Sequence, residues 1–250
     1  MDVQVFGTKQ EMGMSAAEDG AKLIREAIAK QGSANIVVAT GSSQLQMLSA
    51  LAREPDIDWH RVTGFHLDEY VGLPATHPAS FRRYLWERFV SQLPCPLTAF
   101  HYIDGEGDCQ ATCQYLGKII SQTSIDVAFV GIGENGHLAF NDPPADFDTR
   151  LPYFVATLDL GCRQQQCNEG WFPSIEAVPQ QAITMSIHQI MQSESIICTV
   201  PDERKAVAVC DALEGEVSPI VPASILNLHR KVTVYLDVPA ASRLTQLKFG

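Results

Sequence analysis

The sequence predicts an α/β fold, with a doubly wound, mostly parallel sheet that carries helices on both faces. The main observation is that short apolar runs alternate with helix-like stretches along the whole chain. A second is that ANIVVAT, at residues 34–40, has the composition of a strand buried on both faces. No low-complexity linker or internal repeat interrupts the sequence, so we expect a single domain over residues 1–250.

The elements follow in order from the N-terminus. The first helix is supported by apolar residues at helical spacing, among them Ile24, Ala27 and Ile28, and we expect it to end at Gly32. We expect a strand at 3–6, a helix at 15–32, strands at 34–40 and 59–70 with a helix at 42–54 between them, helices at 77–93 and 108–123, and a strand at 125–133. The alternation continues through 183–193, 195–200, 202–215, 224–229 and 231–237.

Composition narrows the function classes. The net charge of −11 argues against a nucleic-acid binder, because such proteins present a basic face. There is no secretory signal and no apolar run of membrane-spanning length, so we expect a soluble cytoplasmic protein that does not associate with membranes. The seven cysteines include no CxxC pair, and we interpret them as reduced thiols without a metal.

Ligands of open α/β sheets bind outside the carboxyl ends of the strands, and two anion-binding candidates fall there. The first is TGSS, which is Thr40, Gly41, Ser42 and Ser43, between a buried strand and a helix. Small residues and helix N–H groups suit a phosphate, although an N-cap turn without a ligand has the same pattern. The second is Lys205, in the first turns of a helix after a strand, where a solvated lysine is the alternative.

Two further motifs carry acid–base groups. Asp68 and Glu69 close a strand in the segment HLDEY, and neighbouring side chains on a strand point in opposite directions, so one acid could reach the site. The stretch GIGENGHLAFND places a glycine-rich turn after a strand, with His137 in it and Asp142 five residues further on. A histidine beside an acid can serve as an oriented acid–base pair, while a structural histidine is the alternative. Together the four motifs indicate an enzyme for a small phosphorylated metabolite.

In this order and spacing, TGSS, FHLDEYVGLPATHPASFRRYL, VGIGENGHLAFNDP and ERKAVAV resemble the glucosamine-6-phosphate deaminase (isomerase) family. The resemblance extends from about residue 15 to residue 240. It implies a modified Rossmann-like fold and no metal or organic cofactor. It also implies an aldose–ketose isomerisation of an amino-sugar phosphate with loss of ammonia, so that the partner is a small sugar phosphate.

The resemblance also assigns roles to residues. Asp68 matches the base that moves a proton between C2 and C1 of the sugar. His137 matches the histidine that assists ring opening, and Asn135 and Asp142 match positions that orient it. The phosphate contacts match Thr40, Gly41, Ser42, Ser43 and Lys205.

This sequence departs from the family pattern in three places. Some members have Asp where Asn135 stands, and Glu is usual where the shorter Asp142 stands. An arginine that binds phosphate usually precedes an aromatic pair, but here Glu169 and Gly170 precede Trp171 and Phe172. Arg163 is a candidate substitute. A carboxylate beside a phosphate dianion is unfavourable, so either Glu169 points away or the substrate differs.

Two alternatives of other classes stay open. A 6-phosphogluconolactonase shares the fold, but its motifs would read DGHTASLFP and DER rather than NGHLAFNDP and DEY. A non-catalytic sugar-phosphate-binding protein is the third hypothesis, favoured only by the missing arginine. Relatives are monomers or larger symmetric assemblies, so a homo-oligomer is possible. Because the tail after YLDV is short, we expect no activation by an amino-sugar phosphate.

Overall fold

The computed structural model describes residues 1–245. Its main sheet has seven strands, and every neighbouring pair in it is parallel. The predicted mostly parallel sheet is therefore confirmed. The strand order is β1 (Asp2–Phe6), β10 (Val232–Asp237), β9 (Ser195–Val200), β6 (Val127–Val130), β2 (Ala34–Val38), β3 (Val62–His66) and β5 (Ala99–His101).

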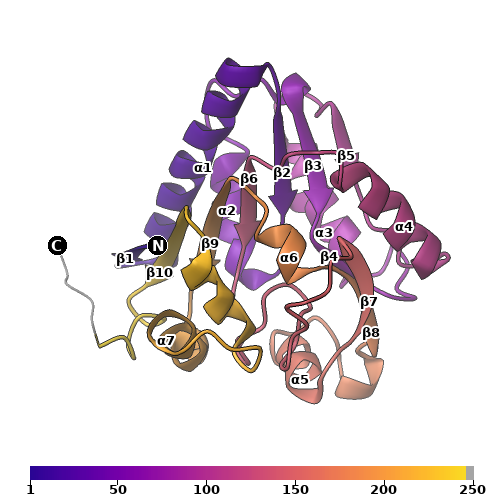
Figure 1. The fold of residues 1–250 in the computed structure, drawn as a ribbon, viewed down its shortest axis with the longest axis vertical. Coiled ribbons are helices and arrows are strands. Elements are labelled where there is room, and N and C mark those ends of the chain that lie inside the picture. Colours follow the sequence, from indigo (N-terminus) through magenta and orange to yellow (C-terminus); the bar gives the residue numbers. More distant parts are fainter. Residues whose placement is uncertain (246–250) are drawn as a thin grey trace.

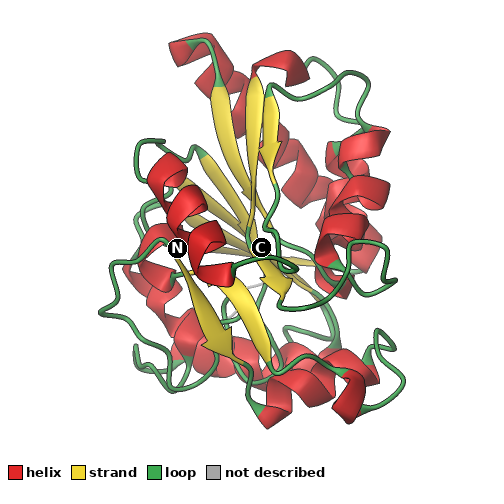
Figure 2. Cartoon of the chain, turned by 90° about the vertical axis from the view of Figure 1, so that its right-hand side faces the viewer, coloured by secondary structure: helices red, strands yellow, loops and turns green. Residues whose placement is uncertain are grey.

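Helices cover both faces of this sheet (Figures 1 and 2). Side chains alternate along each strand, so Ile36 and Val38 enter one apolar cluster while Val37 enters another. The first cluster also takes side chains from α1 (Lys9–Gln31), α2 (Leu45–Leu51) and α3 (Phe81–Arg88). The second takes side chains from α4 (Cys109–Ile120), α6 (Ile187–Ile190) and α7 (Ala206–Glu214). A further helix is α5 (Leu160–Asn168).

A second, smaller sheet changes the prediction for residues 59–70. We expected one strand there, but the strand stops at His66 and a separate strand, β4 (Asp68–Tyr70), begins after Leu67. β4 pairs antiparallel with β8 (Gln181–Met185), which pairs antiparallel with β7 (Tyr153–Thr157). The chain thus leaves the main sheet just before Asp68, and this exit places the acid at the sheet's edge.

The first helix is longer than predicted. It begins at Lys9 rather than at residue 15, because the Thr8 hydroxyl accepts the backbone N–H of Glu11 as an N-cap. It ends as predicted at Gly32, which adopts the left-handed conformation with φ of 85°. No helix among residues 1–245 is long and apolar enough to cross a membrane.

The central strands β2 and β3 point toward the end of the molecule where α5 and α7 lie (Figure 1). Since the strands of the main sheet run parallel, the segments that follow β2, β3, β6 and β9 meet at one edge. Residues 40–43, Asp68, residues 131–137 and Lys205 lie on those segments. This edge is where the sequence predicts a ligand.

Candidate active site

A cavity opens at the carboxyl edge of the main sheet. Its walls come from the segments after β2, β3, β6 and β9, together with the N-terminus of α3 and the end of α5. The lining residues are Ala39, Thr40, Gly41, Ser42, Ser43, Gln44, Leu67, Asp68, Phe81, Gly131, Ile132, Gly133, His137, Ala139, Phe140, Gln165, Gln166, Glu169 and Lys205. Seven predicted site residues are therefore brought together around one cavity.

The predicted phosphate turn, residues 40–43, follows β2 directly. Its carbonyl at Gly41 accepts the Gln44 backbone N–H at 3.1 Å and the Tyr84 hydroxyl at 2.9 Å, and these bonds fix the turn. The helix that follows is short: one 3₁₀ turn, Ser42–Gln44, precedes the seven residues of α2. All four turn residues line the cavity, so this turn presents hydroxyl and backbone groups to a ligand.

Lys205 is buried and ends a 3₁₀ turn, Glu203–Lys205, that leads into α7. Its Nζ donates a hydrogen bond of 2.8 Å to the backbone carbonyl of Ile132, on the segment after β6. Burial lowers the pKa of this lysine, and the Glu169 carboxylate is the largest influence that raises it. The interpretation of Lys205 as a solvated lysine is therefore wrong.

The adjacent acids Asp68 and Glu69 point in opposite directions, as their position on a strand predicts. Glu69 faces inward and accepts the backbone N–H groups of Phe81 and Arg82 and the Ser80 hydroxyl, so it caps α3. Asp68 lines the cavity, and within residues 1–245 its carboxyl accepts no hydrogen bond. Burial, and then the charge of Glu69, raises the pKa of Asp68 to about 8.

The glycine-rich turn after β6 brings the His137 imidazole to the cavity. Gly136 has φ of 81°, which favours glycine, and it reverses the chain just before the histidine. A Cβ atom on Gly133 would lie 2.2 Å from Cε1 of His137, so only glycine lets the ring lie against the turn. These glycines therefore determine where the His137 ring lies, and they do not form a phosphate-binding loop.

Behind the histidine lies Asp142. Its Oδ1 is 3.3 Å from Nδ1 of His137, within ion-pairing distance, although the ring N–H is not aligned with the oxygen. The Asp159 backbone N–H donates to Oδ2 at 3.0 Å. Burial alone would raise the pKa of Asp142, but the nearby His137, the Asp159 N–H and the Asn135 amide lower it. The shorter acid thus still reaches the ring.

Asn135 connects these groups without lining the cavity. Its Nδ2 donates to Oδ1 of Asp142 at 3.2 Å and to Oδ2 of Asp159 at 2.7 Å, and its Oδ1 accepts the His137 backbone N–H. The side chain therefore holds both the carboxylate and the histidine backbone. The predicted grouping of Asn135, His137 and Asp142 is present.

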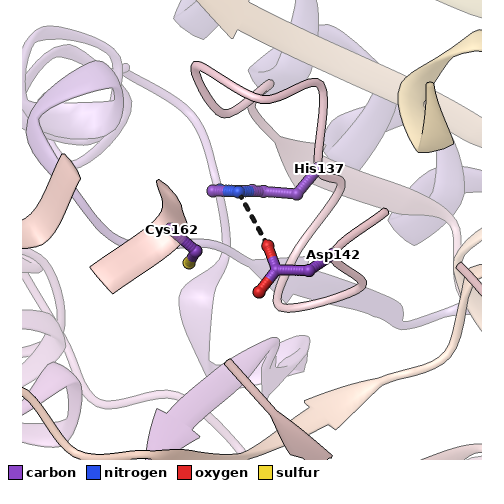
Figure 3. A group of neighbouring side chains, drawn as sticks. All are labelled: His137, Asp142 and Cys162. Carbon is purple, nitrogen blue, oxygen red and sulfur yellow. Dashed lines mark ion pairs between the residues drawn. The ribbon is translucent and has the colours of Figure 1, made fainter. Parts of the chain in front are cut away.

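Donor atoms of His137, Asp142 and Cys162 lie within 4.8 Å of one another, and this group could hold a cation (Figure 3). The chemistry of the thiol opposes this interpretation. Burial, and then the charges of Asp142 and Asp159, raise the pKa of Cys162 above its ordinary value. A cysteine binds a metal as the thiolate, so a cation at this group would have to displace the thiol proton.

Two predicted features near α5 need correction. Arg163, the candidate phosphate ligand, does not line the cavity; its Nη2 donates to the carbonyls of Ile175 and Val178 at 2.6 and 3.2 Å. Glu169 does not point away, because it lines the cavity and its Oε2 accepts the Ser42 hydroxyl at 3.0 Å. Arg163 is thus a structural residue, and the end of the cavity formed by residues 40–43 contains an acid.

Two residues that the sequence does not single out, Gln165 and Gln166, also line the cavity from α5. Oε1 of Gln165 accepts the Glu134 backbone N–H at 2.9 Å, and Oε1 of Gln166 accepts the Tyr70 hydroxyl at 2.8 Å. Their only signal is the polar run QQQ, in which nothing marks the residues that face inward.

The family model for glucosamine-6-phosphate isomerases and 6-phosphogluconolactonases matches residues 7–235. The chain belongs to this family. A glucosamine-6-phosphate deaminase of Oenococcus oeni is 34% identical over 248 residues, which cover 98% of this chain and 100% of the relative. One of Shouchella clausii is 35% identical over 245 residues, covering 95% of both chains.

Solved structures of family members give the same architecture. A monomeric glucosamine-6-phosphate deaminase has a TM-score of 0.89 at 34% identity, with 97% of this chain and 100% of that chain covered. A 6-phosphogluconolactonase of Thermotoga maritima has a TM-score of 0.76 at 18% identity, covering 94% and 98%. At that identity the second likeness shows the fold alone.

Proposed function

We propose that this family member converts glucosamine 6-phosphate and water into fructose 6-phosphate and ammonia. The observation that carries the proposal is that the unpaired Asp68 carboxyl and the His137 imidazole line one cavity. The identity of about a third over nearly the whole length of named deaminases supports the same reaction. The motifs NGHLAFNDP and DEY also favour it over lactone hydrolysis.

Ring opening comes first, because the cyclic sugar has no free carbonyl. His137 moves a proton between the anomeric hydroxyl and the ring oxygen, so that the C1–O5 bond breaks and the aldehyde forms. Oδ1 of Asp142 lies 3.3 Å from Nδ1 of the imidazole, and this carboxylate stabilises the protonated ring during the transfer. Asn135 is a positioning residue, since it contacts Asp142 and the histidine backbone rather than the cavity.

Isomerisation then needs one base. The ionised Asp68 carboxylate takes the proton from C2, which the neighbouring aldehyde acidifies, and an enolamine forms as O1 takes a proton from water. Asp68 then returns its proton to C1 while the amino nitrogen loses a proton to water, leaving a C2 imine that water hydrolyses to the ketose and ammonia. A carboxyl without other hydrogen-bond partners is suited to this shuttle, because its oxygens face the substrate.

The 6-substituent of the sugar lies at the other end of the cavity. There the turn of residues 40–43 supplies hydroxyl and backbone donors, and the Lys205 ammonium supplies the positive charge. The ligand is thus a small sugar phosphate, and no organic cofactor is needed for proton transfer. We place the enzyme in the cytoplasm, where such metabolites occur, and assembly into a homo-oligomer stays a prediction.

Ammonia release tests the reaction directly. Purified protein is incubated with glucosamine, galactosamine and mannosamine 6-phosphates, and ammonia and ketose phosphate are measured together. We expect both products in equal amounts from at least one hexosamine phosphate, and neither from the Asp68→Asn variant. Hydrolysis of 6-phosphogluconolactone without ammonia release from any amino sugar would replace this proposal with the lactonase alternative.

A further inference from the structure

Glu169 lies at the end of the cavity that the proposed function assigns to the phosphate. Its Oε2 accepts the hydroxyl of Ser42 at 3.0 Å, so one of the donors in the phosphate turn is already directed at a carboxylate. Lys205 lines the same cavity, and burial lowers its pKa while the charge of Glu169 opposes that lowering. The Glu169 carboxylate and the Ser42 hydroxyl are therefore joined by a hydrogen bond in the cavity wall.

The carboxylate is held from three segments of the chain. Besides Ser42, the amide of Gln165 donates to its Oε1 at 2.9 Å and the indole N–H of Trp171 donates to its Oε2 at 3.2 Å. The Trp171 ring packs edge-on against Tyr84, whose hydroxyl binds the carbonyl of Gly41 in the same turn. These contacts fix Glu169 as part of the wall.

The positive charge at this end is small. Among the described residues that line the cavity, Lys205 is the only lysine or arginine. Arg204, beside it in sequence, lies 3.0 Å from Glu134 and 3.7 Å from Asp202, so its charge is already compensated. With one ammonium and one carboxylate, the phosphate end has no net charge to offer a dianion.

We propose that Glu169 is a specificity-determining residue, which lowers the affinity of this pocket for a dianionic C6 phosphate relative to a monoanionic C6 ester. The inference deepens the proposed function and rests on it for the direction in which the sugar lies. A dianionic phosphate meets repulsion from Glu169 at hydrogen-bonding range and only one cation in return. A monoanionic ester, such as a sulfate, meets half of that repulsion and keeps the Lys205 contact.

Binding of two acyclic probes tests the inference without turnover. The probes are 2-amino-2-deoxyglucitol 6-phosphate and the corresponding 6-sulfate, which lack the carbonyl and cannot be isomerised. Affinities are measured by calorimetry at about pH 8, where the phosphate is a dianion. The variants are Glu169→Gln, which keeps the side chain's shape, and Glu176→Gln, which removes an exposed acid from the same region as a matched control.

We expect Glu169→Gln to tighten binding of the 6-phosphate by roughly tenfold or more and that of the 6-sulfate by clearly less. We expect Glu176→Gln to change neither. Unchanged affinity for the phosphate, or equal gains for both probes, would overturn the inference, since Glu169 would then not select by charge. Failure of both probes to bind to either protein would overturn it too, because the pocket would not hold the C6 substituent.

The two proposals fail in different ways. If no hexosamine phosphate releases ammonia while Glu169→Gln still favours the phosphate probe, the deaminase proposal fails and charge selection stands. If ammonia is released and the variant leaves the ratio of the two affinities unchanged, the function stands and charge selection fails.

Discussion

Nδ1 of His137 lies 3.3 Å from Oδ1 of Asp142, and the same oxygen accepts the amide of Asn135 at 3.2 Å. In the mechanism that we propose, a carboxylate in this place stabilises the imidazolium that forms during ring opening. It is itself buried, and His137 contributes to the lowering of its pKa. The two groups therefore interact electrostatically, and replacing one of them should change the electrostatic environment of the other.

The first prediction concerns this pair. Replacement Asp142→Asn should lower kcat by about two orders of magnitude, because the neutral amide no longer stabilises the protonated ring. Steady-state ammonia release measures the effect. Asp142→Glu is the matched control, since it keeps the charge, and it should retain most of the activity. Equal losses in the two variants would show that geometry, rather than charge, matters at this position.

The second prediction is the pH dependence. Burial raises the pKa of Asp68 to about 8, so at neutral pH most of the free protein carries this group protonated. The base must be ionised, and kcat/KM should therefore rise with pH and level off above about 8. A profile that is already flat from about pH 5 would mean that the carboxyl titrates near its ordinary value.

The third prediction is one of stability. The pKa of Asp68 is 3.8 when unperturbed and about 8 in the folded protein, so the unfolded state ionises first. The resulting penalty on folding is absent below the unperturbed pKa of 3.8. It grows as the pH rises from there to the folded-state pKa of about 8, and it is constant above that pKa. Asp68→Asn removes it and should raise the free energy of unfolding at pH 8 by about 2 kcal/mol or more.

Denaturant unfolding at several pH values provides the measurement for this stability effect. The gain of Asp68→Asn should shrink as the pH falls from 8 and vanish below the unperturbed pKa of 3.8, because the wild-type carboxyl is then protonated in both states. A gain that is independent of pH would have to come from packing.

The fourth prediction concerns Gly133. Because a Cβ atom there would lie 2.2 Å from the His137 ring, Gly133→Ala should displace the imidazole and lower kcat by about tenfold or more. Gly117→Ala is the control, since its Cβ would be in ordinary contact with Pro152, 3.7 Å away. That helix position should gain about 0.5–1 kcal/mol of stability without loss of activity. Normal activity of Gly133→Ala would contradict the assigned role of the turn.

The fifth prediction concerns the cation at the phosphate end. Lys205→Met keeps the apolar stem but removes the ammonium, and it should raise KM for a hexosamine phosphate by about tenfold or more. Arg204→Met is the control, because that side chain is paired with Glu134 and Asp202 outside the cavity. A change in kcat with unaltered KM would place Lys205 in the chemistry instead.

Much of the site could be predicted from particular residues. The turn after β2, the acid at the exit of β3, the histidine after β6 and the lysine after β9 lie together because parallel strands end at one edge. The direction of the Asp68 and Glu69 side chains also followed from strand geometry. Sequence patterns were sufficient to predict the site residues that immediately follow a strand, because the strand itself determines their position.

The remaining features depend on contacts between distant segments. The strand predicted at 59–70 is interrupted at Leu67 because β4 pairs with β8, which lies more than 100 residues away in sequence. No residue pattern near Leu67 predicts this interruption. Glu169 and Gln165 face the cavity because of bonds to Ser42 and Glu134. Arg163 instead binds the carbonyls of a nearby turn, which composition alone does not distinguish from a phosphate contact.

The central claim is that Asp68 carries the proton between C2 and C1. The most direct measurement uses glucosamine 6-phosphate deuterated at C2, with NMR detection of the label in substrate and product. We expect the wild-type protein to remove the label from C2 as ammonia appears, and Asp68→Asn to bind the sugar but leave the label in place. Loss of the label at the wild-type rate in Asp68→Asn would contradict it.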